Sequence, residues 1–390
     1  MRILRQLIAG AAVAATAAVL AAGPAMADPK PGVHPRPKDV VGVGSDTIQN
    51  VMDQLSVDYN KAHSASSQQH LYSWDATNPK TGAIHDHIVT KTGCPSTFVR
   101  PNGSSEGIAA LTTQNATTHG HPCLDFARSS RDRAPTDPPF ASGGIAFITL
   151  AGDAVTYATQ ATTHAPTNLT TAQLTAIYTC AVTNWNQVGG SNAPIKAFIP
   201  QTGSGTRSFF LSAIGVATPG PCVSDGGGKL EENEGVNTVL HSPNAIVPYS
   251  VGKFIAQVYH SANCLKASCK PVNGVVCKPK KGQNLFGCDA HGTMKLHKIN
   301  GTSPTVPFPL PKPPANPVIN KNFTPGFSRT LFDVVKFATG TSDHMPSRFH
   351  KFFGHNGWVC KSTKAKADLR HYGFLVVSAG TAAGQCGSTH

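Results

Sequence analysis

Short apolar runs alternate along the chain with apolar residues at the three- and four-residue spacing of a helix. Val40–Val43 is typical of a short buried strand, and Ile195–Ile199 is another. The helical patterns that follow these two runs consist of Ile48, Val51, Met52, Leu55 and Tyr59, and of Phe209, Phe210 and Ile214. Further strands are predicted at Gly144–Leu150 and Arg329–Val335, and further helices after the capping box Thr170–Gln173 and at Arg348–Phe353. This alternation predicts an α/β fold class with central sheets.

Three glycine-rich turns stand directly before predicted helices, at Gly42–Thr47, Asn102–Gly107 and Gly203–Arg207. Glycine lets the backbone approach a ligand closely, and the serine and threonine side chains beside it donate hydrogen bonds. A helix N-terminus adds unpaired N–H groups and partial positive charge. One such turn is common, but three of them far apart in the chain predict a shared site for a small oxyanion.

Residues 1–27 have the pattern of a signal peptide for export. Arg2 and Arg5 form the charged start, Leu7–Ala22 the apolar stretch, and Ala25–Ala27 the cleavage motif. The apolar stretch is shorter than the ~20 residues of a bilayer span, and no cysteine for a lipid anchor follows the cleavage motif. We therefore expect a secreted, extracellular protein without a transmembrane helix.

The mature part of the chain is long enough to predict two lobes rather than a single core. It begins with a proline-rich leader over residues 28–39, which we expect to be extended and mobile. Residues 260–325 interrupt the alternation of strands and helices with four cysteines and a proline-dense tract. They predict a Cys/Pro-rich insertion.

All ten cysteines lie in the exported part, where disulfides are the expected state. Pairing of neighbours in sequence predicts Cys94–Cys123, Cys180–Cys222 and Cys360–Cys386. The other four cysteines predict two more bridges in one of three connectivities, and they are Cys264, Cys269, Cys277 and Cys288. A metal site at Cys264 and Cys269 is the alternative, but export argues against it.

The chain is basic, and this charge predicts an anionic ligand without identifying it. Without the two signal-peptide arginines, its 33 basic residues become 31 against 20 acidic ones, a net charge of +11. Cell-wall polyanions are therefore an alternative ligand class. Specific nucleic-acid binding is not expected, because the basic run Lys278–Lys281 has almost no aromatic neighbours for stacking. His85–His87 and His119–His121 lie in polar loops, and we expect no metal, no other cofactor and a monomeric protein.

The segment Leu169–Phe210 resembles the phosphate-binding receptors of ABC importers, which have the type II periplasmic-binding-protein fold. It contains Leu-Thr-Thr-Ala-Gln-Leu-Thr-Ala-Ile-Tyr, then Asn-Trp-Asn-Gln-Val-Gly, then Gly-Ser-Gly-Thr-Arg-Ser-Phe. The resemblance implies two lobes joined by hinge-crossing strands that close over an oxyanion, most of all phosphate, and an ABC importer as partner. Lobe I would comprise residues 40–150 and 327–390, and lobe II residues 151–326 with the insertion. Release without an anchor suits a scavenger or sensor equally.

Carried over position by position, the resemblance also implies ligand-binding residues. The first turn corresponds to a glycine–threonine loop, the second to a serine loop, Phe126–Ser130 to a glycine–alanine–serine–aspartate turn, and the third to a serine–glycine–threonine turn. The ligand-binding residues so implied are Ser45, Asp46, Thr47, Ser104, Ser105, Ser129, Ser130, Ser204, Gly205, Thr206 and Arg207.

Two positions depart from the family pattern. The family aspartate that accepts the proton of hydrogen phosphate falls on Ser130, and the family arginine before the third turn falls on Pro200. A serine hydroxyl both donates and accepts, so it distinguishes phosphate from sulfate less sharply than a carboxylate does. Asp46 is the candidate for the acceptor role, and Arg207 or Arg128 for the cationic one.

A secreted serine esterase is the alternative from another class. Gly103–Gly107 fits the G-x-S-x-G nucleophile elbow, with Ser105 as the nucleophile. The elbow needs an uninterrupted strand leading into it, and Pro101 and Asn102 interrupt the run before it. The protein is therefore expected not to be an enzyme.

Overall fold

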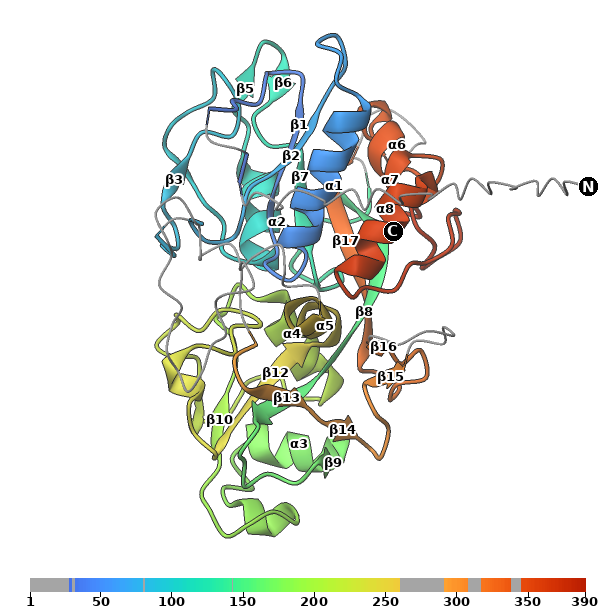
Figure 1. Cartoon of the computed structure of the whole chain (residues 1–390). Coiled ribbons are helices and arrows are strands. Elements are labelled where there is room, and N and C mark those ends of the chain that lie inside the picture. Colours follow the sequence, from blue (N-terminus) through green and yellow to red (C-terminus); the bar gives the residue numbers. More distant parts are fainter. Residues whose placement is uncertain are drawn as a thin grey trace, which may run out of the picture.

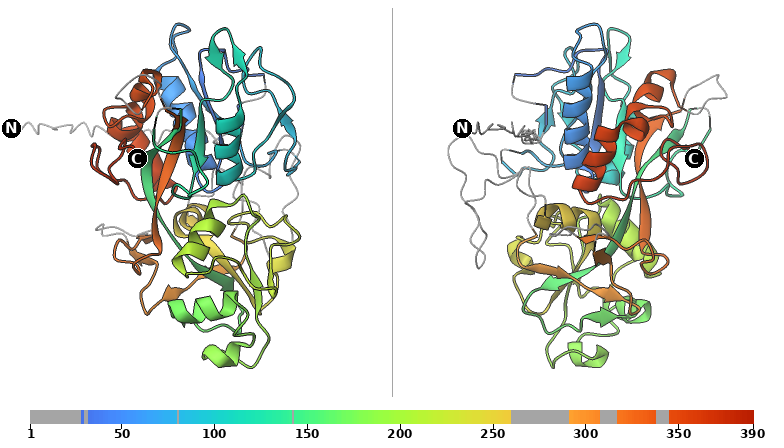
Figure 2. Two further views of the ribbon diagram at one scale, coloured as in Figure 1. Left: turned by 180° about the vertical axis from the view of Figure 1, so that it is seen from behind. Right: turned by 45° about the vertical axis from the view of Figure 1, so that its right-hand side comes forward.

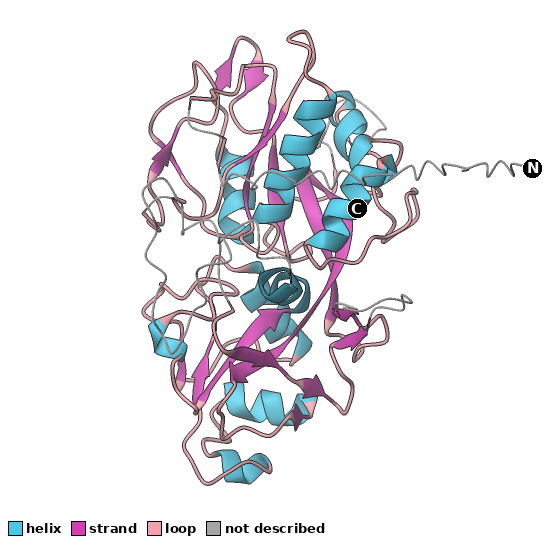
Figure 3. Cartoon of the chain, in the orientation of Figure 1, coloured by secondary structure: helices cyan, strands magenta, loops and turns pink. Residues whose placement is uncertain are grey.

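One main sheet extends through two lobes of the protein (Figure 1). The computed structural model describes residues 28–29, 32–79, 81–141, 143–259, 291–307, 317–337 and 345–390. The strands of the main sheet run in the order β11 (Val223–Ser224), β10 (Lys196–Phe198), β12 (Ala245–Ser250), β8 (Ile145–Gln160), β17 (Ser328–Lys336), β7 (Phe126–Ser129), β1 (Val40–Gly44) and β2 (Leu71–Ser73), with β13 (Met294–Leu296) paired to β8. Figure 3 shows helices beside the strands in each lobe, so the predicted α/β class is confirmed.

Strands β8 and β17 cross from one lobe to the other, as Figure 2 shows from behind and in an oblique view. They pair antiparallel from Ile145↔Lys336 to Ala154↔Ser328, and the far end of β8 pairs with β12. The sequence predicted only the start of β8, because Asp153, Thr156 and Thr159 interrupt its apolar pattern. These polar side chains are buried but hydrogen-bonded, which lets the strand continue through the interior.

We call lobe I the part around β1, β2 and β7. Its helices are α1 (Gln49–Ala62), α2 (Ser104–Thr113), α6 (Ser347–Phe353), α7 (Trp358–Lys361) and α8 (Thr363–His371), and its two small hairpins are β3 (His87–Ile88) with β4 (Phe98–Val99) and β5 (Thr117–Thr118) with β6 (His121–Pro122). The predicted apolar face of α1 is buried and packs against the C-terminal helices, where the Tyr59 and Phe352 rings lie 4.7 Å apart. Segments from both ends of the chain thus share one core.

Lobe II surrounds β10, β11 and β12. Its other elements are β9 (Asn168–Leu169), β14 (Lys298–Ile299), β15 (Thr305–Pro307), β16 (Pro317–Ile319), the helices α3 (Thr171–Tyr178), α4 (Gly205–Ala213) and α5 (Val251–Tyr259), and the short 3-10 helices η1 (Trp185–Val188) and η2 (Thr238–Leu240). The predicted capping box is confirmed, since Thr170 accepts from the N–H of Gln173 and the Gln173 side chain accepts in return. No helix in the described part of the chain has the length and apolarity of a membrane span.

The cysteine predictions are confirmed where the structure describes them. Bridges join Cys94 to Cys123, Cys180 to Cys222 and Cys360 to Cys386. The other four cysteines, Lys278–Lys281 and the predicted signal peptide lie outside the described residues. The described end of the predicted insertion belongs to lobe II, because β13 extends the main sheet and Phe323 is buried in the core.

The leader is held against lobe I where it is described, in contrast to the expected mobility. The Asp28 carboxylate accepts from Arg100 Nη1 and Nη2 at 2.8 and 2.9 Å. Lys91 Nζ donates to the carbonyl of Pro37 at 3.3 Å, and Arg36 Nη2 of the leader donates to the carbonyl of Gln68 at 2.8 Å. Charged side chains elsewhere in lobe I therefore fix a proline-rich segment that has no periodic pattern of its own.

Candidate functional site

The three glycine turns meet where the lobes face each other. The N–H of Ser105 donates to the carbonyl of Gly203 at 3.1 Å. Thr47 Oγ1 lies 3.2 Å from Thr206 Oγ1, although 159 residues separate the two in sequence. The structure therefore brings residues of all three turns together.

Glycine is required at two positions of this contact between the lobes. A Cβ on Gly203 would lie 2.5 Å from the carbonyl oxygen of Asn102, and one on Gly103 would lie 2.5 Å from the carbonyl oxygen of Gly203. Gly103 also has a φ of +108°, which side chains rarely adopt. The second and third turns thus touch backbone to backbone, and larger residues would hold the lobes apart.

The third turn opens α4. Ser204 is the N-cap of this helix, and its Oγ accepts from the N–H of Arg207 at 2.9 Å, so this hydroxyl serves the helix. Gly205 packs against lobe I, because a Cβ on it would lie 2.4 Å from both Ser104 Oγ and Ser130 Oγ. Thr206 is fully buried between the lobes.

The predicted site serines of the second turn and of the end of β7 divide into two pairs. Ser104 Oγ accepts from the N–H of Ser130 at 3.0 Å, and both hydroxyls face Gly205. Ser129 and Ser105 instead contact Arg131, since Ser129 Oγ donates to its carbonyl at 2.7 Å and Ser105 Oγ accepts from its Nε at 3.0 Å. Arg131 itself is held by Asp137 in an ion pair of 2.6 Å.

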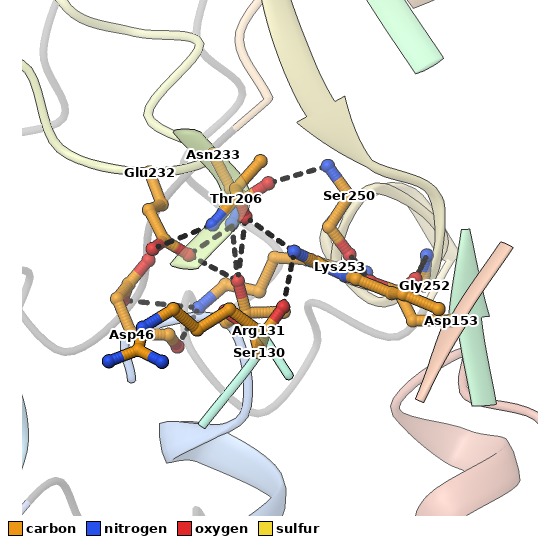
Figure 4. A network of polar contacts seen from close by, with 12 residues as sticks. Asp46, Ser130, Arg131, Asp153, Thr206, Glu232, Asn233, Ser250, Gly252 and Lys253 are labelled. Carbon is orange, nitrogen blue, oxygen red and sulfur yellow. Dashed lines mark hydrogen bonds and ion pairs between the residues drawn. The ribbon is translucent and has the colours of Figure 1, made fainter. Parts of the chain in front are cut away.

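A carboxylate that the sequence did not indicate lies at the centre of the site. Glu232, with 1% of its surface exposed, accepts hydrogen bonds from Thr206 Oγ1 at 3.0 Å and from the Thr206 N–H at 3.3 Å (Figure 4). It also accepts from Thr47 Oγ1 of the opposite lobe. Asn233 Nδ2 donates to Thr47 Oγ1 at 3.3 Å. Donors from both lobes therefore converge on one anionic group.

The cation nearest to these donors is Arg329, at the start of β17. Its Nη1 donates to Thr206 Oγ1 at 3.1 Å and to the carbonyl of Ser130 at 3.0 Å. Its Nε and Nη2 donate to Asp153 Oδ2 at 2.9 and 2.8 Å. Asp153 also accepts from Ser250 Oγ and from the N–H of Gly252, so the arginine is held rigidly. We call Thr47, Thr206 and Arg329 the cradle.

The arginines considered from the sequence have other contacts. Arg207 Nη1 donates to the carbonyl of Pro200 at 2.9 Å and lies 3.6 Å from Asp225 Oδ2. Arg128 is buried beneath the first turn, where its guanidinium donates to the carbonyls of Gly44 and Ser45. Arg128 thus positions the backbone of the turn.

Asp46, the candidate acceptor from the sequence, lies at the same interface between the lobes. Lys253 on α5 reaches it with an Nζ–Oδ1 distance of 3.6 Å (Figure 4). The same Nζ donates to Asn50 Oδ1 at 2.8 Å. Ser45, its neighbour, is fully buried, and Ser45 Oγ has no hydrogen-bond partner among the described residues. The first turn therefore contributes a free hydroxyl and a charged group.

Beneath the first turn, Asp333 on β17 lies opposite Arg128 on β7. Burial raises the pKa of Asp333 from 3.8 to about 8, although Arg128 opposes the shift. Between about pH 4 and pH 8 the folded state therefore holds a proton that the unfolded chain has lost. Stability falls across this window as pH rises, by up to about 1.4 kcal/mol per pH unit for one proton.

Asp333→Asn is expected to remove this contribution, because asparagine is neutral at every pH and nearly isosteric with the protonated acid. As pH rises from 5 to 7, the free energy of unfolding of the variant should increase relative to that of the native protein. Urea unfolding at each pH measures this difference. Asp86→Asn is the control, since burial is outweighed by hydrogen bonds, chiefly from Arg100, that lower the pKa of that carboxyl, and an arginine keeps its charge over this whole pH range. A difference between Asp333→Asn and the native protein that stays constant over this range would contradict the assignment.

The alternatives gain no support from these contacts. The strand before the G-x-S-x-G sequence, β4, belongs to a separate hairpin, and the Ser105 hydroxyl contacts Arg131 rather than a histidine. Within the described residues, no group of three or more His, Cys, Asp or Glu side chains has the arrangement of a metal site. What the site offers is hydrogen-bond donors and positive charge for an anion.

The comparisons with known proteins agree with this architecture. A family model described as the PBP superfamily domain matches residues 15–264, more than half of the chain. An ABC-type phosphate transport receptor from Vibrio cholerae is 20% identical, with a TM-score of 0.50 over 86% of this chain and 99% of that one. A putative phosphate ABC transporter substrate-binding protein with bound phosphate from Clostridium perfringens is 17% identical, with a TM-score of 0.51 over 86% of this chain and 98% of that one.

At these identities the solved structures establish the fold, and they confirm the predicted two-lobed α/β architecture. The family match is to the sequence itself and includes all three glycine turns and Glu232. The chain therefore belongs to the PBP superfamily.

Proposed function

We propose that this protein is an exported solute-binding protein that captures an inorganic oxyanion, above all phosphate, between its two lobes. The observation that carries the proposal is the cradle, in which hydroxyl and N–H donors from both lobes hold carboxylate oxygens. Carboxylate and phosphate oxygens both accept short, charge-assisted hydrogen bonds from such donors at a buried site. A site that binds the one is chemically suited to the other.

The donors are sufficient in number for useful affinity. Thr47 and Thr206 supply two hydroxyls, α4 supplies the Thr206 N–H at its N-terminus, and Arg329 supplies positive charge. Each hydrogen bond to a charged group contributes about 1.5–3 kcal/mol. Four or five of them would supply the ~8 kcal/mol of micromolar binding. The buried hydroxyl of Ser45 is a further donor.

Phosphate is favoured as the ligand by two considerations. Both solved structures named above carry phosphate in their descriptions, and one contains it. Asp46 in the first turn is an acceptor for the proton of hydrogen phosphate, a group that sulfate lacks at neutral pH. An ABC importer is the corresponding partner, and secretion places the protein where it would collect its ligand.

Isothermal titration of the exported protein with phosphate and with sulfate tests the proposal. The protein is first dialysed until a colorimetric assay detects no phosphate in a denatured sample. We expect a micromolar or tighter Kd for phosphate and weaker binding of sulfate. Binding of neither anion by phosphate-free, folded protein would contradict the proposed function, and equal affinities would contradict the role of Asp46.

A further inference from the structure

The carboxylate of Glu232 occupies the hydroxyl and N–H donors of the cradle, which a bound anion would also use. It accepts from Thr47 of lobe I and from both the hydroxyl and the N–H of Thr206 in lobe II. It is buried, and Arg329 adds positive charge at the same threonine. We propose that Glu232 is an internal ligand of the cradle that draws the lobes together and that an external oxyanion must displace.

The backbone around Glu232 is held in a way that presents its side chain to the cradle. Asn233 has a φ of +57°, a left-handed conformation that is uncommon outside glycine. Three contacts to lobe II maintain this conformation. The N–H of Ser250 donates to Asn233 Oδ1 at 2.8 Å, and the backbone carbonyl of Asn233 accepts from Gln257 Nε2 at 2.8 Å and from the Tyr249 hydroxyl. Figure 4 shows Asn233 between Glu232 and Ser250. Lobe II thus fixes the position from which Glu232 reaches Thr47.

An external anion and Glu232 cannot use these donors together. A threonine hydroxyl has one proton to donate, and so has the N–H of Thr206. Two negative charges at one set of donors also repel each other. The measured affinity for an external anion is therefore the intrinsic affinity of the cradle multiplied by the fraction of molecules in which Glu232 has withdrawn.

Glu232→Gln tests the competition, and this arm rests on the proposed function. Glutamine keeps the length of the side chain but carries no charge, so it is a much weaker competitor for the donors. We expect the Kd for phosphate to fall at least tenfold in isothermal titration. Glu234→Gln is the matched control, because it is the same substitution two residues away. The Glu234 carboxylate accepts from Asn237 Nδ2 of its own lobe at 2.8 Å. Unchanged or weaker phosphate binding in Glu232→Gln would overturn the proposal.

A second experiment measures lobe closure and does not depend on phosphate binding. In phosphate-free buffer, Glu232→Ala is expected to have a larger radius of gyration by small-angle X-ray scattering than the native protein and Glu234→Ala. Acetate, which supplies a free carboxylate for the vacated donors, should reverse the expansion in Glu232→Ala and leave the other two proteins unchanged. Equal radii in all three proteins, with circular dichroism showing that each is folded, would overturn the proposal even if phosphate binds. If none of the proteins binds phosphate, the proposed function fails, and the scattering experiment alone decides the role of Glu232.

Discussion

Replacement of Arg329 by methionine is expected to lower the free energy of unfolding by about 3–5 kcal/mol. Arg329 and Asp153 form a buried pair, with 2% and 0% of their side chains exposed and 2.8 Å between Nη2 and Oδ2. Methionine fills much of the volume, but it leaves the Asp153 carboxylate in the interior without its counter-charge. Urea unfolding followed by circular dichroism measures the loss.

The double variant Arg329→Met with Asp153→Asn separates the charge effect from packing. Asparagine is neutral, and its single side-chain oxygen can still accept from the N–H of Gly252, while its amide NH2 takes the place of the oxygen that faces Ser250 Oγ. We expect the double variant to regain most of the lost stability, a coupling that a double-mutant cycle quantifies. Arg207→Met is the less buried counterpart, where the pair with Asp225 spans 3.6 Å and the expected loss is at most about 1 kcal/mol. A double variant as unstable as Arg329→Met would show that packing, not charge, holds this part of the hinge.

Replacement of Gly203 by alanine is expected to weaken phosphate binding at least tenfold, about 1.4 kcal/mol. The added Cβ would lie 2.5 Å from the carbonyl oxygen of Asn102 in the opposite lobe. This is a backbone atom that cannot rotate away, so the turns would separate. The contact between Thr47 and Thr206, at 3.2 Å, would open with them and divide the donors between two distant surfaces. Isothermal titration gives the change in Kd.

The same position offers a graded control. Gly203→Val adds more volume at an unchanged backbone position and should weaken binding further than alanine does. Thermal unfolding should show that both variants remain folded, because most of the added atoms' contacts lie across the interface between the lobes. Native-like phosphate affinity in Gly203→Ala would mean that ligand binding does not require the closed contact seen between the second and third turns.

The sequence by itself determined most of the local structure. The spacing of Ile48, Val51 and Leu55 predicted α1, and the capping box at Thr170 predicted the start of α3. All these features depend on interactions within a helical turn, a cap or a short loop, which the chain carries wherever it is placed. The glycine turns belong to this class as well, since each is a local motif before a helix.

Only the tertiary structure decided which charged groups meet at those turns. Glu232 lies 26 residues from Thr206 and Arg329 lies 123 residues from it, and neither stands in a motif that marks an anion site. Their places follow from the path of the chain, because β17 returns through the hinge beside β8 and the segment after Gly228 is fixed on α5 through Asn233. Burial then makes the pairing obligatory, since a charge inside the protein requires a partner whatever its distance along the sequence. The turns were therefore local and predictable, whereas the charges that occupy and complete them depend on the packing of the two lobes.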